Sequence, residues 1–471
     1  MTEFFLDDKI VRQTAGSLRQ EKKMMNYENE AINALDRLMK AAEAKADDCI
    51  RIRRDLHMYP EAGWTEFRTT AKVVEYIEDD ELQAELGADV ILPEAVLDYP
   101  QADVLTGHRF RAISQGADRT IIRRIEEKGG YTGAMFTIEG SQPGPTVALR
   151  FDMDCMAVPE PSDGKHVPYA MDFASRNEGL MHACGHDGHT AMGMVLAKIL
   201  QENRNLLKGR VKVLFQPAEE GVKGARAMVE RGILDDVDVV LGMHIYPAEG
   251  DYPALAGTQT GLYATRKWDV TLTGKTAHAG GAPQEGNNAI LAAVSAISAM
   301  NGFLQDGRGV SRLNVGTIEG GPGRNAIPGY CRFQAETRGS ETAVEERIYE
   351  KAAGCVKAAA EMFGCEYEIN ICGMSPAGGG DSGKAAELAA LAAELVPELK
   401  GTAPVQVNTG TADDFCYMID RVKEGGGWGC YMALQSKLAA GLHNTYYDFD
   451  ESVLLAGVKS CIAGLQLAGT I

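Results

Sequence analysis

The sequence predicts an α/β protein whose larger domain is a mostly parallel sheet with helices on both faces, interrupted by a smaller α+β domain. Between residues 131 and 244, short apolar runs of strand length alternate with segments of helical periodicity, which is typical of a parallel sheet covered by helices. Residues 267–379 carry the order β-α-β-β-α-β instead, as in a ferredoxin-like unit. We therefore assign residues 1–266 and 380–471 to the larger domain and residues 267–379 to an inserted one.

Length, charge and cysteine usage restrict the class of protein. A chain of 471 residues is long enough for two or three domains. Lys and Arg number 47 against 66 Asp and Glu, and the resulting net charge of -19 argues against nucleic acid or an anionic membrane as a partner. The ten cysteines show no paired spacing, and there is neither a signal-like start nor a run of about 18 apolar residues. We expect a soluble, cytoplasmic protein.

Two helices are predicted before the first strand. Apolar residues spaced three and four apart describe a long amphipathic helix over residues 28–57, and a second helix is predicted near 67–78. His57 stands alone at the end of the first helix, where a histidine more often packs or caps than binds a metal. Residues 80–130 have no clear period, and we interpret them as an insertion that borders the functional site.

The following strands end in polar side chains. Strands are predicted over residues 133–139, 146–152, 210–217 and 237–243. The second ends at Asp152, Glu219 and Glu220 follow the third, and His244 follows the fourth. Ligands of an open α/β sheet bind outside the carboxyl ends of its strands, so these side chains are expected to converge. Taken alone, Asp152 could also be a solvated strand end. Of two adjacent glutamates, one can bind a cation while the other acts on water.

Residues 181–190 hold the densest group of potential metal ligands, with three histidines, a cysteine and an aspartate. Cys184 and His186 are two residues apart, so in an extended loop both side chains reach a common cation. Thr190 is predicted to cap a helix that runs to about residue 202. A zinc-stapled structural loop is the alternative, but such sites usually use paired Cys-x-x-Cys knuckles. The single cysteine favours an open, catalytic site.

The inserted domain and the C-terminal segment add further candidates. His278, Asn325 and Arg338 lie in the β-α-β-β-α-β unit, and each alone could be a turn or surface residue. Linkers near Lys267 and at residues 378–383 are predicted hinges, the second because it is glycine-rich. His443 lies in a Gly-Leu-His-Asn turn, where a histidine has no packing role, and is predicted to be a ligand.

Taken together, these motifs resemble the M20 family of metallopeptidases and amidohydrolases, in its aminoacylase-like branch. His-Ala-Cys-Gly-His-Asp-Gly-His, Phe-Gln-Pro-Ala-Glu-Glu, the strand-end His244, Ala-His-Ala and Gly-Leu-His-Asn occur in the family's order over about residues 50–471. Residues 63–69 and 172–191, with the insertion before Tyr131, are most similar to the p-aminobenzoyl-glutamate hydrolase subgroup. In that subgroup an A-type chain is associated with manganese and with a related B subunit.

The resemblance implies a role for each matching residue. Glu219 is implied as the general base, and the implied ligands of two divalent cations are Cys184, His186, Glu220, His244 and His443. Substrate contacts are implied for the inserted domain, acting as a lid and dimer contact through His278, Asn325 and Arg338, the histidine often from the other protomer. Asp152 and Asp187 are expected behind the ligands. Arg150 replaces a metal-binding histidine of the peptidase branches, and Asp413 departs from the Glu of the usual Gly-Ser-Glu-Asp.

The resemblance therefore implies a metal-dependent amidohydrolase that releases glutamate, or another amino acid, from an aromatic acyl group such as p-aminobenzoate. Manganese is favoured, although the Cys184 thiolate also suits zinc. Three alternatives remain: a general N-acyl-amino-acid deacylase of the aminoacylase or hippurate hydrolase type, a weakly active subunit that needs a B-like partner, and a metal store. The last gives Glu219 no purpose. The expected assembly, which acts on a small anionic N-acyl amino acid, is a homodimer or a heterodimer with a related B subunit.

Overall fold

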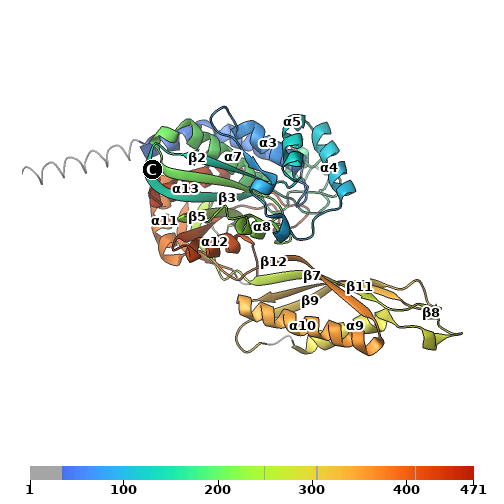
Figure 1. The fold of residues 1–471 in the computed structure, drawn as a ribbon. Coiled ribbons are helices and arrows are strands. Elements are labelled where there is room, and N and C mark those ends of the chain that lie inside the picture. The colour runs from blue at the N-terminus through green and yellow to red at the C-terminus, as the bar shows by residue number, and fades with distance from the viewer. Residues whose placement is uncertain (1–33, 249, 304–305, 409) are drawn as a thin grey trace, which may run out of the picture.

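Two separate β-sheets organise the chain (Figure 1). The computed structural model describes residues 34–471 except 249, 304–305 and 409. The larger sheet has the strand order β1-β2-β4-β3-β5-β14-β6-β13, and the smaller one has the order β12-β7-β11-β9. In Figure 1 the smaller sheet and its two helices project from the larger body as an arm.

The strands of the larger sheet are β1 (Glu85–Leu86), β2 (Ala134–Glu139), β3 (Gln142–Asp152), β4 (Lys208–Gln216), β5 (Val239–Pro247), β6 (Ala254–Thr260), β13 (Gly401–Val407) and β14 (Trp428–Ser436). The helices around it are α2 (Ala46–Met58), α3 (Phe67–Ile77), α4 (Ala102–Ser114), α5 (Arg119–Glu127), α6 (Val167–Ala170), α7 (His186–Glu202), α8 (Gly224–Glu230), α11 (Ser382–Leu395), α12 (Phe415–Glu424) and α13 (Val453–Leu467).

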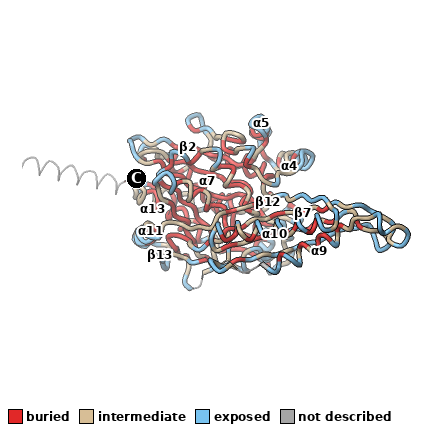
Figure 2. The backbone as a smooth tube through the Cα atoms, turned by 60° about the horizontal axis from the view of Figure 1, so that its bottom comes forward, coloured by how far each residue is buried: buried red, intermediate tan, exposed pale blue. Residues whose placement is uncertain are grey.

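The centre of the larger sheet is parallel and covered on both faces, as predicted. Strands β4, β3, β5 and β14 pair in parallel, whereas β2 and β6 pair antiparallel with their neighbours. One apolar cluster joins the sheet to α2, α3, α7 and α13, and a second joins it to α8 and α12. A strand covered on both faces becomes a continuous buried run, and β3 is buried from Val147 to Asp152 (Figure 2).

The N-terminal helices agree with the prediction except in detail. Residues 34–44 are helical, a turn at Lys45 interrupts the helix, and α2 continues to Met58; residues 28–33 lie outside the described part. The insertion holds α4 and α5. Helix α4 was not predicted, because only Leu105 and Ala112 of its residues are buried and no apolar stripe marks it.

The predicted start of α7 was wrong. The helix begins at His186, and the residue before it, Gly185, has a φ of 93°, in the region that favours glycine. Thr190 is therefore inside the first turns rather than at the cap. Its hydroxyl donates a hydrogen bond of 2.8 Å to the carbonyl of Asp152, which ties the helix to the end of β3.

The smaller sheet has the predicted β-α-β-β-α-β order. Its elements are β7 (Ala264–Thr273), α9 (Ala289–Met300), β9 (Ser311–Gly320), β11 (Tyr330–Gly339), α10 (Thr342–Phe363) and β12 (Glu366–Ser375). All neighbouring strands are antiparallel, and one apolar cluster packs α9 and α10 on the same face of the sheet. Two short strands, β8 (Ala277–His278) and β10 (Ala326–Ile327), pair at its far end (Figure 1).

One predicted hinge was misplaced. Lys267 lies inside β7, held on both sides by β11 and β12, so it cannot act as a linker. The chain instead crosses to the smaller sheet just before β7. There Leu262 and Gly378 exchange two backbone hydrogen bonds of 3.1 and 3.0 Å, so the two crossing segments run side by side. Within the described ranges, no helix combines the length and the apolar character needed to cross a bilayer.

Candidate metal and catalytic site

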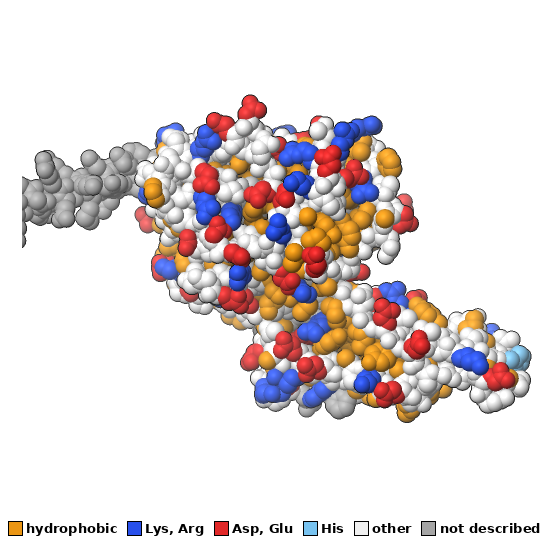
Figure 3. Space-filling model, viewed as in Figure 1, with side chains coloured by type: hydrophobic (Ala, Val, Ile, Leu, Met, Phe, Trp, Pro, Cys, Tyr) orange, Lys and Arg blue, Asp and Glu red, His pale blue; other side chains and the backbone are white. Residues whose placement is uncertain are grey.

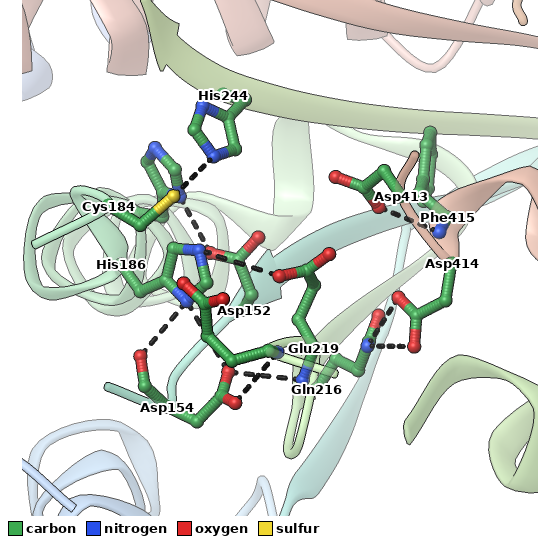
Figure 4. Close-up of polar contacts among 12 residues, drawn as sticks. Asp152, Asp154, Cys184, His186, Gln216, Glu219, His244, Asp413, Asp414 and Phe415 are labelled. Atoms are coloured by element: carbon green, nitrogen blue, oxygen red, sulfur yellow. Dashed lines mark hydrogen bonds and ion pairs between the residues drawn. The ribbon is translucent and has the colours of Figure 1, made fainter. Parts of the chain in front are cut away.

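Six side chains singled out in the sequence meet at the carboxyl end of the central strands (Figure 4). We call them the metal cluster: Cys184, His186, Glu219, Glu220, His244 and His443. The start of α7 supplies two of them, the turn after β4 supplies the glutamates, and β5 and the turn before α13 supply one histidine each. His244 lies within β5 rather than just after it, because that strand continues to Pro247.

The ligand atoms form overlapping sets that share the thiol of Cys184. One set is Cys184, His186 and His244, and another is Cys184, Glu220 and His443, each with all ligand atoms within 4.8 Å of one another. The Sγ atom of Cys184 lies 3.4 Å from Nε2 of His244 and 3.4 Å from Nε2 of His443. Atoms at this separation can each reach a common cation at about 2.0–2.3 Å. The arrangement suits a thiolate between two cations.

Two buried atoms of the cluster have no hydrogen-bond partner among the described residues. They are Nε2 of His186 and an oxygen of Glu220. An unsatisfied buried polar atom costs about 1–3 kcal/mol, and a bound cation would remove that cost. The other ring nitrogens are held by backbone carbonyls: Nδ1 of His186 by Asp154 at 2.9 Å, and Nδ1 of His244 by Ile245 at 2.8 Å. Such contacts orient an imidazole so that its free nitrogen faces a metal.

The cluster also carries more negative charge than the surrounding protein neutralises. Burial, followed by the charges of Asp413 and Glu220, raises the pKa of Glu219 well above its ordinary value. Burial likewise raises the pKa of Glu220 to about 7, although the nearby His186 opposes the rise. Carboxylates in such surroundings are stabilised by a cation. The donor set and its charge therefore fit divalent metal ions.

Asp154 holds the turn that carries the two glutamates, a role that the sequence did not reveal. Its carboxylate accepts hydrogen bonds from the backbone N–H groups of Glu219, at 3.1 Å, and of Glu220, at 2.9 Å. The carboxylate of Glu66 accepts another from the N–H of Ala218, at 2.8 Å. Three consecutive amides of this turn are thus fixed by two buried carboxylates. Only the position of Asp154 after a strand hinted at such a role.

Asp152 and its neighbours form a charged support beneath the metal cluster. Its carboxylate pairs with Arg150 and accepts a hydrogen bond of 2.6 Å from Nδ1 of His189. Arg150 is fully buried and also approaches Asp413 and Asp414, at 3.5 and 3.4 Å. The arginine therefore fills the place where peptidase branches are expected to have a histidine ligand. The Asp413 carboxylate, at the position that departs from the resembling branch, faces this support.

Asp187 faces away from the metal cluster. It accepts hydrogen bonds from Nε of Arg53 and from Nδ1 of His57, each at 2.8 Å. His57 also contacts Glu160 through Nε2 at 3.0 Å, so both of its ring nitrogens are used. The interpretation of His57 as a structural residue agrees with these contacts.

The three candidates from the smaller sheet do not lie together. Arg338 lines a cavity of about 740 Å³ with Glu220 and His443 of the metal cluster. His278 belongs to β8, and the carbonyl of Asn325 accepts a hydrogen bond from the N–H of Ala279, so both lie at the outer end of the arm (Figure 1). Figure 3 shows the arm reaching away from the larger body, with a histidine at its tip. Within one protomer, the structure brings only Arg338 to the site.

Known proteins with this arrangement share most of the chain. Indole-3-acetyl-aspartic acid hydrolase of Enterobacter agglomerans is 39% identical over 87% of this chain and 93% of its own length. The A chain of the p-aminobenzoyl-glutamate hydrolase of Escherichia coli K12 is 38% identical over the same shares. A crystal structure of an aminobenzoyl-glutamate utilization protein from Klebsiella pneumoniae has 32% identity and a TM-score of 0.76, covering 90% of this chain and 96% of that one.

The family predicted from the motifs is confirmed independently of these relatives. Residues 148–463 match the peptidase family M20/M25/M40, a stretch that contains every member of the metal cluster and the whole smaller sheet. The chain belongs to the peptidase family M20/M25/M40.

Proposed function

We propose that this protein is a metal-dependent amidohydrolase that cleaves p-aminobenzoyl-glutamate to p-aminobenzoate and glutamate. The observation that supports this most directly is the pair of ligand sets that share Cys184, next to Glu219 and open to the cavity of Arg338. The names of two relatives support the substrate class, because both describe hydrolysis of an acidic amino acid joined to an aromatic acyl group.

Two divalent cations are proposed, held by Cys184, His186, Glu220, His244 and His443. Manganese is favoured because carboxylate and imidazole suit it, and zinc is the alternative because of the thiolate. When bound, such cations lower the pKa of water to about 7 and polarise an amide carbonyl.

The protein's own residues then have separate tasks. Glu219 accepts the proton of the attacking water and returns it to the leaving amide nitrogen. Its raised pKa makes it a base that readily holds and later donates a proton. Arg338 binds the α-carboxylate of the amino acid, because a guanidinium matches a carboxylate with two parallel hydrogen bonds. The buried support under Arg150 keeps these groups in place.

The inserted domain, whose boundaries we place near residues 262 and 378, is proposed to act as a lid and a dimer contact. His278 and Asn325 are too far along the arm to serve their own protomer in this arrangement, so we propose that they serve a partner's site. Exposed apolar side chains on the arm offer a contact surface: Leu291, Val294 and Ile318. Two relatives are named as one of the lettered chains of a hydrolase, which supports a heterodimer with a B-like partner in place of a homodimer.

Mixing two inactive variants tests the lid proposal. His278→Ala protein mixed with Glu219→Gln protein should regain part of the wild-type rate if the histidine acts across the dimer. Verified mixed dimers with no regained activity would assign His278 to its own protomer.

Hydrolysis of indole-3-acetyl-aspartate is the second candidate activity, because a relative with that name is as similar as the p-aminobenzoyl-glutamate hydrolase chain. A substrate panel tests both: p-aminobenzoyl-glutamate, indole-3-acetyl-aspartate, hippurate and N-acetyl amino acids, with manganese or zinc added to metal-free protein. A preference of tenfold or more in kcat/KM for hippurate or acetyl substrates would overturn the proposal. The unpaired state of all ten cysteines supports a cytoplasmic location as part of it.

A further inference from the structure

Lys267 lies on the face of the smaller sheet that is opposite its helices. Side chains alternate along a strand, and in β7 the even-numbered Trp268, Val270 and Leu272 are buried against α9 and α10. The odd-numbered Lys267 therefore points to the other face. In register, Lys267 lies opposite Glu336 of β11. This face forms one wall of the 740 Å³ cavity that Glu220 and His443 share.

Four basic side chains line this cavity, and three of them are already paired. Lys223 pairs with Asp98 at 2.6 Å, Arg332 with Asp269, and Arg338 with Glu336 at 2.9 Å. Lys267 has no hydrogen bond or ion pair with any residue that the structure describes. Its cross-strand neighbour Glu336 is engaged instead by Arg338 and by the hydroxyl of Thr265, at 3.0 Å. Lys267 is thus the cavity cation available to an anionic ligand.

The charge of Lys267 reaches the metal cluster. It opposes the rise that burial causes in the pKa of Glu220, and together with burial and His186 it lowers the pKa of His443. It also lies near the residue proposed to bind the α-carboxylate. Arg338 is in register with Thr265, two residues from Lys267, and the Cβ atoms of such diagonal neighbours are roughly 7–8 Å apart. Two long side chains at this spacing can converge on one small dicarboxylate.

We propose that Lys267 binds the side-chain carboxylate of the leaving amino acid and thereby selects N-acyl derivatives of glutamate and aspartate over neutral ones. This inference rests on the proposed amidohydrolase function and on Arg338 binding the α-carboxylate. An acidic protein with a net charge of -19 needs such local cations to hold a doubly charged substrate. A second carboxylate bound by its own cation also fixes which way round the amino acid lies.

The test compares p-aminobenzoyl-glutamate with p-aminobenzoyl-glutamine, which has the same shape but a neutral side chain. Wild-type protein should prefer the glutamate compound, and Lys267→Met should lose about 10- to 100-fold in kcat/KM for it, the value of one hydrogen bond to a charged group. The rate with the glutamine compound should stay within about twofold. Lys267→Arg should keep most of the preference. Lys223→Met removes a cation from the same cavity that is paired with Asp98, and should leave the preference unchanged.

Metal content and thermal unfolding of each variant show whether a loss of rate reflects loss of structure. An unchanged glutamate-to-glutamine ratio in Lys267→Met, in protein with wild-type metal content, would overturn the role of Lys267 while leaving the hydrolase intact. Equal rates of wild-type protein on both compounds would do the same. No cleavage of any N-acyl amino acid by metal-loaded wild-type protein would overturn the proposed function itself, and the role of Lys267 with it.

Discussion

Two buried groups of histidines and carboxylates lie on either side of the first turn of α7, and they differ in how their polar atoms are satisfied. The first is the metal cluster. The second, which we call the Arg53 cluster, consists of Arg53, His57, Glu160, His166 and Asp187. Each contains three or more possible ligands whose atoms lie within 4.8 Å of one another. Proximity of ligand types alone would therefore assign a metal to both.

The hydrogen bonds separate the two clusters. In the Arg53 cluster, the three guanidinium nitrogens of Arg53 bind Asp187, Asp448 and Glu451, at 2.8, 2.6 and 3.1 Å. Both nitrogens of His57 are used as well. In the metal cluster, the facing ligand atoms are 3.4–3.9 Å apart, and two of them have no described partner. A satisfied cluster stabilises the fold, whereas an unsatisfied one is ready for a cation.

Helix geometry places consecutive residues in different clusters. His186 and Asp187 are the first two residues of α7, and each step along an α-helix turns the side chain by about 100°. His186 therefore enters the metal cluster, while Asp187 reaches Arg53 and His57 on the other side. Changes in the two clusters should accordingly have different consequences, and four predictions follow that comparison from the largest effect to the smallest.

Replacing Cys184 by alanine should have the largest effect. Because its thiol belongs to both ligand sets, the variant should lose both cations and all activity, whereas His443→Ala should lose chiefly one. Elemental analysis of purified protein measures this directly. Fully active wild-type protein with at most one cation per chain would contradict the shared-thiolate arrangement.

The two adjacent glutamates should fail in different ways. Glu219→Gln keeps the shape but cannot accept a proton, so kcat should fall about 10²- to 10⁴-fold while the metal stays bound. Glu220→Gln should instead weaken one cation, because an amide is a poorer ligand than a carboxylate, and added metal should partly restore the rate. Metal lost from the first variant and kept in the second would show that the roles are reversed.

Removing the cation of the Arg53 cluster should affect stability rather than metal binding. Arg53→Met leaves buried carboxylates without their partner, and breaking a buried ion pair in this way costs about 3–5 kcal/mol of unfolding free energy. Arg51→Met, which removes an exposed pair with Asp48, should cost about 1 kcal/mol or less. Denaturant unfolding compares the two. Equal losses would mean that the Arg53 cluster contributes no more than a surface pair.

The smallest predicted effect is a pH dependence of stability due to His57. Burial alone would lower the pKa of His57, but hydrogen bonds to Asp187 and Glu160 outweigh it and raise the pKa from 6.5 to about 9. A raised folded pKa stabilises the fold fully below the unfolded value, and this stabilisation is lost as the pH rises through the folded value. The free energy of unfolding should therefore decrease between pH 6.5 and about 9.

His57→Gln should flatten this part of the profile, since glutamine does not titrate. An equally steep decrease in the variant would assign the dependence to another group. On the acid side, burial is outweighed by hydrogen bonds from His166 and His57, which lower the pKa of Glu160 from 4.5 to about 2. That contribution is present above pH 4.5 and should be lost as the pH falls towards 2.

Much of the fold and the site was predictable because it depends on local patterns. Alternating strands and helices indicated the parallel sheet, and strand ends at Asp152 and Glu219 indicated where ligands gather, since parallel strands share one carboxyl edge. The spacing of Cys184 and His186 likewise indicated a metal site without any knowledge of distant residues. By contrast β6, β13 and β14 were not predicted, and they join the sheet from segments far apart in the chain.

The sequence by itself determined the family, the β-α-β-β-α-β order of the arm and the identity of the candidate ligand atoms, because each is written in residue types at fixed spacing. Only the tertiary structure decided that Asp154 holds the glutamate turn, that Asp187 serves Arg53, and that Lys267 faces the cavity. These depend on which face of a strand or helix meets which neighbour. That choice is made by packing between elements that are distant in the chain, and no local pattern encodes it.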